Sequence, residues 1–515
     1  MLRALLLCFV LWATLISSSS ADPMRLRLRL SSGPTDLDWS TAGSQITSFV
    51  FANIMDGLTE LDGTLIARPA LAKSIDVSPD GKIYTFRLRE GVKWSDGKPL
   101  RAEDFITSWQ RLLDPLDVKP FAVMLSNVVG AMDYSHGKLK DFTQVGIKVV
   151  QPNGIEVTLV SAQPYFLELL ASPVLFPMRK DLLEAHGRRW SEPGKTAVLG
   201  PYLPVSYEKG KRLVLRRNAG YYGRAPHIDS IDIRIIGEDA IATAMFERGE
   251  LDVVIPVNFK ESESLKNTPV FRTARQFRTR FLYFNCESYP FSMPNARKAV
   301  AMAIDRSKLA YPGKQGFPST EAFTPNELFP EGADIKVPFN LKAAKEALAE
   351  AGVVAEKTAL EIVALSNDEN AIALNEVADQ LRQNLGLKVE VKLLARDFFI
   401  NQITIRAAPL FYLARGAEYP DLNSFMSSFL SDSGLNTMRW KNPKYDELVK
   451  NAAQLPKGSE RTAAYHEALE LLVAKAYAVI PLHFEHFSYL VSSRVKDFMI
   501  SPLGAVNLRT VQLTR

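Results

Sequence analysis

The chain has 515 residues, 47% of them hydrophobic and 23% charged, which is enough apolar material for two or three domains. This composition excludes an intrinsically disordered chain. Its 62 basic residues are scattered among 57 acidic ones, so the net charge of +5 indicates a solvated surface and does not favour nucleic-acid binding.

The N-terminus has the pattern of a secretory signal peptide. Arg3 supplies the positive charge, residues 4–16 are mostly apolar, and a run of small residues ends at Ala21. The apolar run is too short to span a bilayer. Cys8 lies inside that run after a leucine, which does not fit a lipoprotein. We therefore expect an exported, soluble protein that is not a lipoprotein and is cleaved before Asp22.

Removal of the signal peptide leaves Cys286 as the only cysteine of the mature chain. A single cysteine cannot form an internal disulfide, so packing has to supply the stability of the fold. A buried, inert thiol is the favoured interpretation of Cys286, and a nucleophilic cysteine is the alternative.

The first part of the mature chain predicts strands followed by a helix. Residues 25–30 alternate leucine with arginine, which indicates a half-buried strand, and residues 84–88 alternate in the same way. After a turn at Asp96-Gly97, residues 102–113 place their large apolar side chains on one helical face. Arg101 is a poor N-cap for this helix.

The second half of the sequence predicts a mixed α/β domain. Asn340 caps a helix that ends before Gly352, and the order strand, helix, strand over residues 359–394 argues for a βαβ unit. Residues 459–476 predict a long amphipathic helix, and residues 477–484 a strand. We found no internal repeat and no flexible linker, which suggests domains that are interleaved in sequence.

Motifs for catalysis are missing from the sequence. It has no phosphate-binding Gly-Lys-Ser/Thr loop, no Gly-x-Ser-x-Gly and no Cys-x-x-Cys, and the helix around His466 lacks a second zinc-binding histidine. In a strand, His483 and His486 would point to opposite faces, so they could not hold one metal ion together. We expect no enzyme, no cofactor and no metal.

Several segments resemble the periplasmic oligopeptide-binding proteins of ABC importers, which are the oligopeptide/dipeptide-binding type of extracellular solute-binding protein family 5. The strongest is residues 56–115, which contain DGLTELDG and GVKWSDGKPLRAEDFITSW. The resemblance spans nearly the whole mature chain and keeps the order of the family. Its other segments are YFLELLASPVLFP, LGPYLPVSYEKGKRLVLRRNAGYY, FERGELDVV, FLYFNCESYPFSMPNARKAVAMAIDRSKL and SFLSDSGLNTMRWKNPKYDELV.

The resemblance implies an α/β fold with two lobes, the type II, cluster C periplasmic-binding-protein fold, with an extra domain inserted in the first lobe. It also implies a monomer that encloses an oligopeptide between the lobes and delivers it to inner-membrane permease subunits served by cytoplasmic ATPases. The implied location is the periplasm. The expected domains are a signal peptide (1–21), lobe I (22–60, 186–283 and 485–515), the inserted domain (61–185) and lobe II (284–484).

Peptide-binding members carry Trp-x-Ala-Asp-Tyr where this chain has RGAEY. By resemblance, Glu418 takes the acidic position that pairs with a peptide ammonium, Tyr419 matches, and Arg415 replaces the tryptophan. The alternative is that Glu418 pairs with Arg415, Arg278 or Arg280 and is structural. We expect Asp421 to be a turn or capping residue.

Four further positions align with ligand-lining residues of the family, and each could equally be a packing residue. They are Gln45, Phe121, Phe398 and Tyr412. The paired cysteines of one branch of the family are absent, and their positions correspond to Arg278 and Gly416.

Three rival functions stay open. The same fold could bind a non-peptide ligand such as a metal chelate, haem, a glycan, an opine or another anionic solute, which Arg415 would suit. An exported enzyme could use the cleft, although it would need a nucleophile or a metal. A ligand-sensing partner of a membrane receptor is the third possibility.

Overall fold

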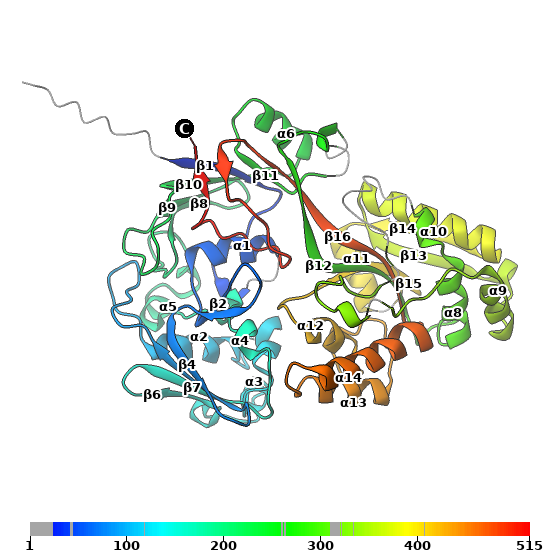
Figure 1. The fold of residues 1–515 in the computed structure, drawn as a ribbon, viewed down its shortest axis with the longest axis horizontal. Helices are drawn as coiled ribbons and strands as arrows, with labels where there is room; N and C mark the ends of the chain where they lie inside the picture. The colour runs from blue at the N-terminus through cyan, green and yellow to red at the C-terminus, as the bar shows by residue number, and fades with distance from the viewer. Residues whose placement is uncertain are drawn as a thin grey trace, which may run out of the picture.

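The protein is seen in a computed structural model that describes residues 24–41, 45–117, 119–258, 261, 264–309, 320, 322–332, 334–405 and 407–514. The predicted signal peptide lies outside these residues. Figure 1 shows two lobes, blue to green on the left and yellow to orange on the right, joined by two long strands. These are β12 (Phe271–Phe284) and β16 (Val479–Val491).

One mixed sheet of ten strands runs through both lobes. Its strands, in spatial order, are β14 (Lys388–Leu394), β13 (Ala359–Leu365), β15 (Leu410–Gly416), β12, β16, β11 (Val253–Ile255), β1 (Arg25–Leu30), β10 (Ser230–Ile235), β9 (Arg212–Arg217) and β8 (Tyr202–Glu208). Because β12 and β16 pair with each other at its centre, both connections between the lobes belong to the same sheet.

The predicted alternation in β1 is confirmed, because its three leucines are buried in the first-lobe core. The strand is more enclosed than a half-buried strand, however, since it lies between β10 and β11 and the Arg29 side chain is 0% exposed. The Arg29 guanidinium donates to the carbonyl oxygens of Ile236 (2.7 Å) and Pro256 (2.6 Å) and pairs with Asp239. Those partners satisfy a charge that burial would otherwise make costly.

The first lobe also carries smaller elements. Its strands are β2 (Thr59–Leu61), β3 (Ala67–Pro69), β17 (Val495–Lys496) and β18 (Gln512–Leu513), and a four-stranded antiparallel sheet of β4 (Ala72–Val77), β5 (Ile83–Leu88), β7 (Gly154–Thr158) and β6 (Ile147–Val150). Its helices are α1 (Gln45–Ile54), α2 (Ala102–Leu112), α3 (Ala131–Ser135), α4 (Phe166–Leu169), α5 (Lys180–His186) and α6 (Asp239–Glu247). The predicted strand over residues 84–88 is β5, and its apolar side is buried as expected.

Helix α2 begins as predicted, but its start is better satisfied than Arg101 suggested. The Asp104 carboxylate accepts the backbone N–H of Arg101 (3.0 Å) and the indole N–H of Trp94 (2.9 Å). The backbone N–H of Ala102 donates to the side-chain oxygen of Asn153 (3.0 Å), which comes from the turn between β6 and β7. A capping partner 51 residues away cannot be read from the local sequence.

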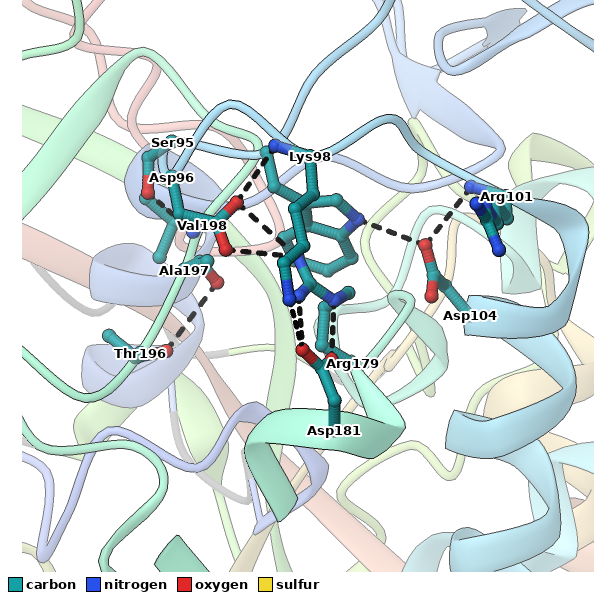
Figure 2. Close-up of polar contacts among 11 residues, drawn as sticks. Ser95, Asp96, Lys98, Arg101, Asp104, Arg179, Asp181, Thr196, Ala197 and Val198 are labelled. Atoms are coloured by element: carbon teal, nitrogen blue, oxygen red, sulfur yellow. Dashed lines mark hydrogen bonds and ion pairs between the residues drawn. The ribbon is translucent and has the colours of Figure 1, made fainter. Parts of the chain in front are cut away.

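Figure 2 shows how this cluster continues around Arg179. The Arg179 guanidinium lies between the carboxylates of Asp96 (3.2 Å) and Asp181, and over the Trp94 ring at 5.9 Å. Lys98 adds a second ion pair to Asp181 (2.7 Å). The residues of GVKWSDGKPLRAEDF therefore hold α2, α5 and the preceding loop together, which is a structural role.

The second lobe contains the predicted βαβ unit, because β13 and β14 are parallel neighbours joined by α10 (Asp368–Leu385). Its other helices are α8 (Pro294–Ala303), α9 (Leu341–Glu350), α11 (Arg396–Thr404), α12 (Asn423–Met426), α13 (Pro443–Ala452) and α14 (Ser459–Glu470). Asn340 caps α9 as predicted, accepting the N–H of Ala343 (3.0 Å). The helix predicted over 459–476 ends its α-helical part at Glu470 and continues as a short π-helix, Leu471–Lys475.

The two lobes have separate hydrophobic cores. One is built from residues between 26 and 255 and between 489 and 513, and the other from residues between 281 and 482. Between them, the pairing of β12 with β16 shifts register between Arg275 and Thr279, where the Phe277 N–H donates to Pro502 O (2.8 Å). The expected domain boundaries stay a prediction. No helix within the described ranges has the length and apolarity needed to span a membrane.

Candidate functional site

The C-terminal part of β15 has an open edge. Strand β15 pairs with β12 along its whole length, from Leu410 to Gly416, but its pairing with β13 covers only Leu410 to Tyr412. Within the described part of the chain, residues 413–416 therefore have a strand on one side only. Such an edge presents unpaired backbone groups that an extended chain can use.

Glu418 lies at the end of this edge. Its backbone N–H donates to the Ser424 hydroxyl (2.8 Å), which fixes the backbone. Among the described residues, the Glu418 carboxylate forms no hydrogen bond and no ion pair. Burial raises the pKa of Glu418 above its ordinary value, and the positive charges of Arg278 and Arg415 only partly oppose this. Glu418 is nevertheless exposed to solvent, so the site holds an accessible carboxylate that has no cationic partner among the described residues.

The two arginines of β12 are engaged elsewhere. Arg278 and Arg280 both pair with Glu485 of β16. Burial alone would raise the pKa of Glu485, but the two guanidinium groups outweigh it and hold that pKa below its ordinary value. Arg280 also donates to Asn370 (2.5 Å) at the start of α10. The hypothesis that Glu418 is neutralised by an ion pair with one of these arginines does not match this arrangement.

Arg415 lies on the opposite face of the sheet from Arg278, since its register partner on β12 is Thr279. Its Nη2 donates to Leu435 O (3.3 Å), whereas its Nε–H is buried and has no hydrogen-bond partner among the described residues. The register also places Arg278 directly opposite Gly416.

Tyr412 is only 2% exposed and belongs to the second-lobe core. Its hydroxyl is 2.6 Å from Nε2 of His483, and the Arg280 guanidinium lies 5.6 Å from its ring centre. Burial and the neighbouring Arg280 lower the pKa of His483 well below its ordinary value, so the imidazole is neutral. A ligand contact by Tyr412 stays a prediction.

Tyr419 reaches the first lobe. Its ring stacks on that of Tyr165, with centroids 5.0 Å apart and planes 9° apart. Asn423 donates to the Tyr419 hydroxyl (3.1 Å). Asp421 accepts the backbone N–H of Asn423 (2.9 Å), as expected of a turn residue, and also pairs with Arg461 (2.7 Å).

The three remaining candidates are spread over different elements, and their ligand roles stay predictions. Phe398 lies on α11 and is 70% exposed, which leaves its ring free for an apolar contact. Phe121 is half-buried against the first-lobe core. Gln45 is the first residue of α1, and its side chain lies outside the described part of the structure.

The residues weighed for metal binding or nucleophilic chemistry have structural environments. His483 and His486 both lie in β16, opposite Arg280 and Arg275, and the strand geometry predicted for them is confirmed. Burial raises the pKa of the Cys286 thiol to about 11, which disfavours the reactive thiolate. In the described ranges, no group of three or more His, Cys, Asp or Glu side chains could hold a metal ion.

Sequence reasoning missed the contacts between the lobes. Asn423 donates to the Tyr165 hydroxyl (2.7 Å) although the two residues are 258 positions apart. Lys457 pairs with Glu168 (2.7 Å) across the same interface. The sequence around each of these residues gives no sign of the partner, because the partner lies hundreds of residues away in the other lobe.

Comparisons with known proteins agree with this architecture. The family model described as bacterial extracellular solute-binding proteins, family 5 middle, matches residues 67–437, which is most of the chain. The chain is 27% identical over 493 residues to the dipeptide-binding protein DppE of Bacillus subtilis, covering 92% of this chain and 89% of the relative. It is 28% identical over 486 residues to the probable deoxycholate-binding periplasmic protein YgiS of Escherichia coli, covering 91% and 89%.

A solved structure shows the same fold. The crystal structure of Haemophilus influenzae OppA in complex with the peptide RPPGFSPFR superposes with a TM-score of 0.82. The superposition covers 96% of this chain and 99% of that chain, at 24% sequence identity. At this identity the likeness supports the two-lobed α/β fold and nothing finer.

Proposed function

Because the chain belongs to family 5 of the bacterial extracellular solute-binding proteins, we propose that it captures oligopeptides between its two lobes and delivers them to the permease of an ABC importer. The names of the relatives support a peptide ligand, since one is a dipeptide-binding protein and a structural neighbour was solved with a nine-residue peptide. The proposed location is the periplasm, reached through a cleaved signal peptide.

The observation that carries the peptide proposal is the open edge of β15 next to Glu418. An extended peptide can add to residues 413–416 as a further strand, using backbone groups and therefore little sequence specificity. Its terminal ammonium would then supply a cationic partner for the Glu418 carboxylate, which has none in the described ranges. Tyr419, Arg415, Phe398, Phe121, Tyr412 and Gln45 are the further residues that we propose to line the cleft.

The proposed partners are the inner-membrane permease subunits and their ATPases, which the family role requires. Family 5 is a family of solute-binding proteins rather than of enzymes, and we propose that this chain, as a monomer, releases its ligand unchanged. The receptor-partner alternative would be favoured if a pull-down retained a membrane receptor and no permease subunit.

Native mass spectrometry of the protein purified from its own cell envelope tests the peptide proposal. We expect the released ligands to be a ladder of short peptides. A single non-peptide mass would refute the peptide ligand and leave the fold assignment intact. A matched titration compares trialanine with N-acetyl-trialanine on refolded, ligand-free protein. We expect only the free-amine peptide to bind tightly, because the acetylated one cannot offer an ammonium to Glu418.

One observation favours a second ligand class. One relative is named as a deoxycholate-binding protein, and the buried Nε–H of Arg415 has no hydrogen-bond partner among the described residues. An anionic, non-peptide solute is therefore the alternative ligand. Under this alternative, binding would not depend on a free amine, and deoxycholate would bind the refolded protein more tightly than trialanine does.

A further inference from the structure

A polar socket lies in the second lobe just beyond Glu418. Asp421 pairs with Arg461 (2.7 Å), whose Nε–H also donates to Ala452 O (3.0 Å). The Tyr465 hydroxyl donates to the side-chain oxygen of Asn423 (3.0 Å). These four side chains are nearly fully buried, so α14 and the segment that leads into α12 are joined by a connected polar network. We define the socket as Tyr419, Asp421, Asn423, Arg461 and Tyr465.

Tyr165 of the first lobe fills this socket. Its hydroxyl accepts a hydrogen bond from the Asn423 amide (2.7 Å) and its ring stacks on Tyr419. The Arg461 guanidinium lies 5.9 Å from the centre of the Tyr165 ring. Tyr165 is itself buried, although it belongs to neither hydrophobic core. Its ring stacking and its hydrogen bond with Asn423 are both contacts with the other lobe.

The socket and the connecting strands lie at opposite ends of the interface between the lobes. Figure 1 shows α4, which follows Tyr165, facing α12 and α14 in the lower part of the molecule, whereas β12 and β16 cross between the lobes above. Lys457 and Glu168 add an ion pair beside the socket (2.7 Å). Glu418, the proposed ligand anchor, directly precedes the socket residue Tyr419.

We propose that Tyr165 and its socket form a latch that holds the two lobes closed and sets how long the cleft retains its ligand. All of the latch contacts are between protein groups, so they form without a ligand and bias the lobes toward closure. The effect on ligand retention rests on the proposed function, whereas the effect on lobe closure is independent of it.

The latch contributes modestly because opening lets water replace the hydrogen bond. One hydrogen bond of this kind changes an equilibrium about 2- to 13-fold, and a stacked aromatic pair changes it by a similar factor. A bias of this size is smaller than the effect of a ligand that contacts both lobes. Ligand binding therefore still determines the equilibrium between the open and the closed state.

Small-angle X-ray scattering of the refolded, ligand-free protein tests the latch. We expect Tyr165→Ala to increase the radius of gyration, and Tyr165→Phe to shift the closed-to-open ratio about 5-fold toward open. Tyr202→Phe is the matched control, because it removes a buried hydroxyl that donates to Leu508 O within the first lobe (3.2 Å). We expect this control to leave the scattering unchanged.

The latch is refuted if Tyr165→Ala and the parent protein scatter alike, or if Tyr202→Phe opens the lobes as much as Tyr165→Phe does. Retention is measured separately, as the dissociation rate of trialanine, which Tyr165→Phe should raise about 5-fold with no larger loss in Tm than the control. Absence of trialanine binding in the parent protein would count against the proposed function and leave the scattering result standing.

Discussion

Two charged regions of this molecule differ in whether their carboxylates have hydrogen-bond and ion-pair partners. Around Trp94, the Asp104 carboxylate accepts two hydrogen bonds, and Asp96 and Asp181 share one guanidinium. At the end of β15, the Glu418 carboxylate has no such partner among the described residues. The carboxylates of the first region have their partners within the protein, whereas we propose that the Glu418 carboxylate finds its partner in the ligand.

This difference helps to explain why one segment matches the family pattern closely and the other does not. The WSDGKPLRAEDF segment is easily matched because one connected network fixes many of its residues, and that network serves stability. Glu418 stands in a segment that departs from the pattern of the family, at the open edge of β15. The strong motif match therefore identifies the fold and carries little information on the ligand.

The sharpest test of this comparison is Glu418→Gln. We expect the affinity for a free-amine peptide to fall by about 3–5 kcal/mol, because the ammonium would be left in the cleft without its counter-charge. The Tm of the ligand-free protein should be unchanged, since the exposed Glu418 carboxylate makes no hydrogen bond or ion pair with the described residues. Calorimetric titration and thermal unfolding of the same samples check both parts. A lower Tm with full affinity would make Glu418 structural.

Asp104→Ala should behave in the opposite way. It removes the acceptor of two hydrogen bonds and leaves the buried indole N–H of Trp94 unpaired, so we expect unfolding to become easier by about 3 kcal/mol. Ligand affinity should stay within about 2-fold of the parent value. Urea unfolding gives the first quantity, and Asp141→Ala, which removes an exposed cap, is the milder control. Equal losses in the two variants would contradict the central role of Asp104.

Asp56 is an intermediate case, because it is hydrogen-bonded and still costly to ionise. It accepts from the Tyr221 hydroxyl (2.8 Å), yet burial raises its pKa to about 6, despite the nearby Arg509. The folded state therefore binds a proton more tightly than the unfolded state, whose Asp pKa is about 3.9. Its contribution to stability is fully present below about pH 4 and is lost as the pH rises through 6.

We therefore expect Asp56→Asn to change the pH dependence of stability. The difference in unfolding free energy between the parent and the variant should shift by about 2 kcal/mol in favour of the parent as the pH is lowered from 7 to 4. Urea unfolding at several pH values measures this difference, in which the other titrating groups cancel. A pH-independent difference would show that Asp56 titrates normally.

Local periodicity predicted much of the secondary structure, because each signal lies within a few residues. The strand alternation at residues 84–88, the Asn340 cap and the βαβ unit all follow from such signals. The two-lobed fold came from family resemblance, since periodicity carries no information on how distant segments meet. The ten-stranded sheet that joins both lobes was not foreseen for that reason.

The candidate site was predicted only in part. Family position singled out Glu418, and the structure adds that its carboxylate has no partner among the residues described. It also redirects attention from Arg415, which lies on the opposite face of the sheet from Arg278. Tyr165 and Asn423 could not have been paired from sequence, because nothing in either motif indicates that the other lobe buries it.

The interleaving of the chain has a consequence for how this protein is made. The core of the first lobe includes residues between 489 and 513, and Asn53 exchanges hydrogen bonds with the backbone of Val506 (2.9 Å) and Leu508 (2.9 Å). A chain that emerges N-terminus first can finish its second lobe before its first. Until about the last 25 residues have been made, the apolar side chains of the first lobe cannot be fully buried. Exposed apolar surface favours aggregation, so we expect chaperones to bind these early segments.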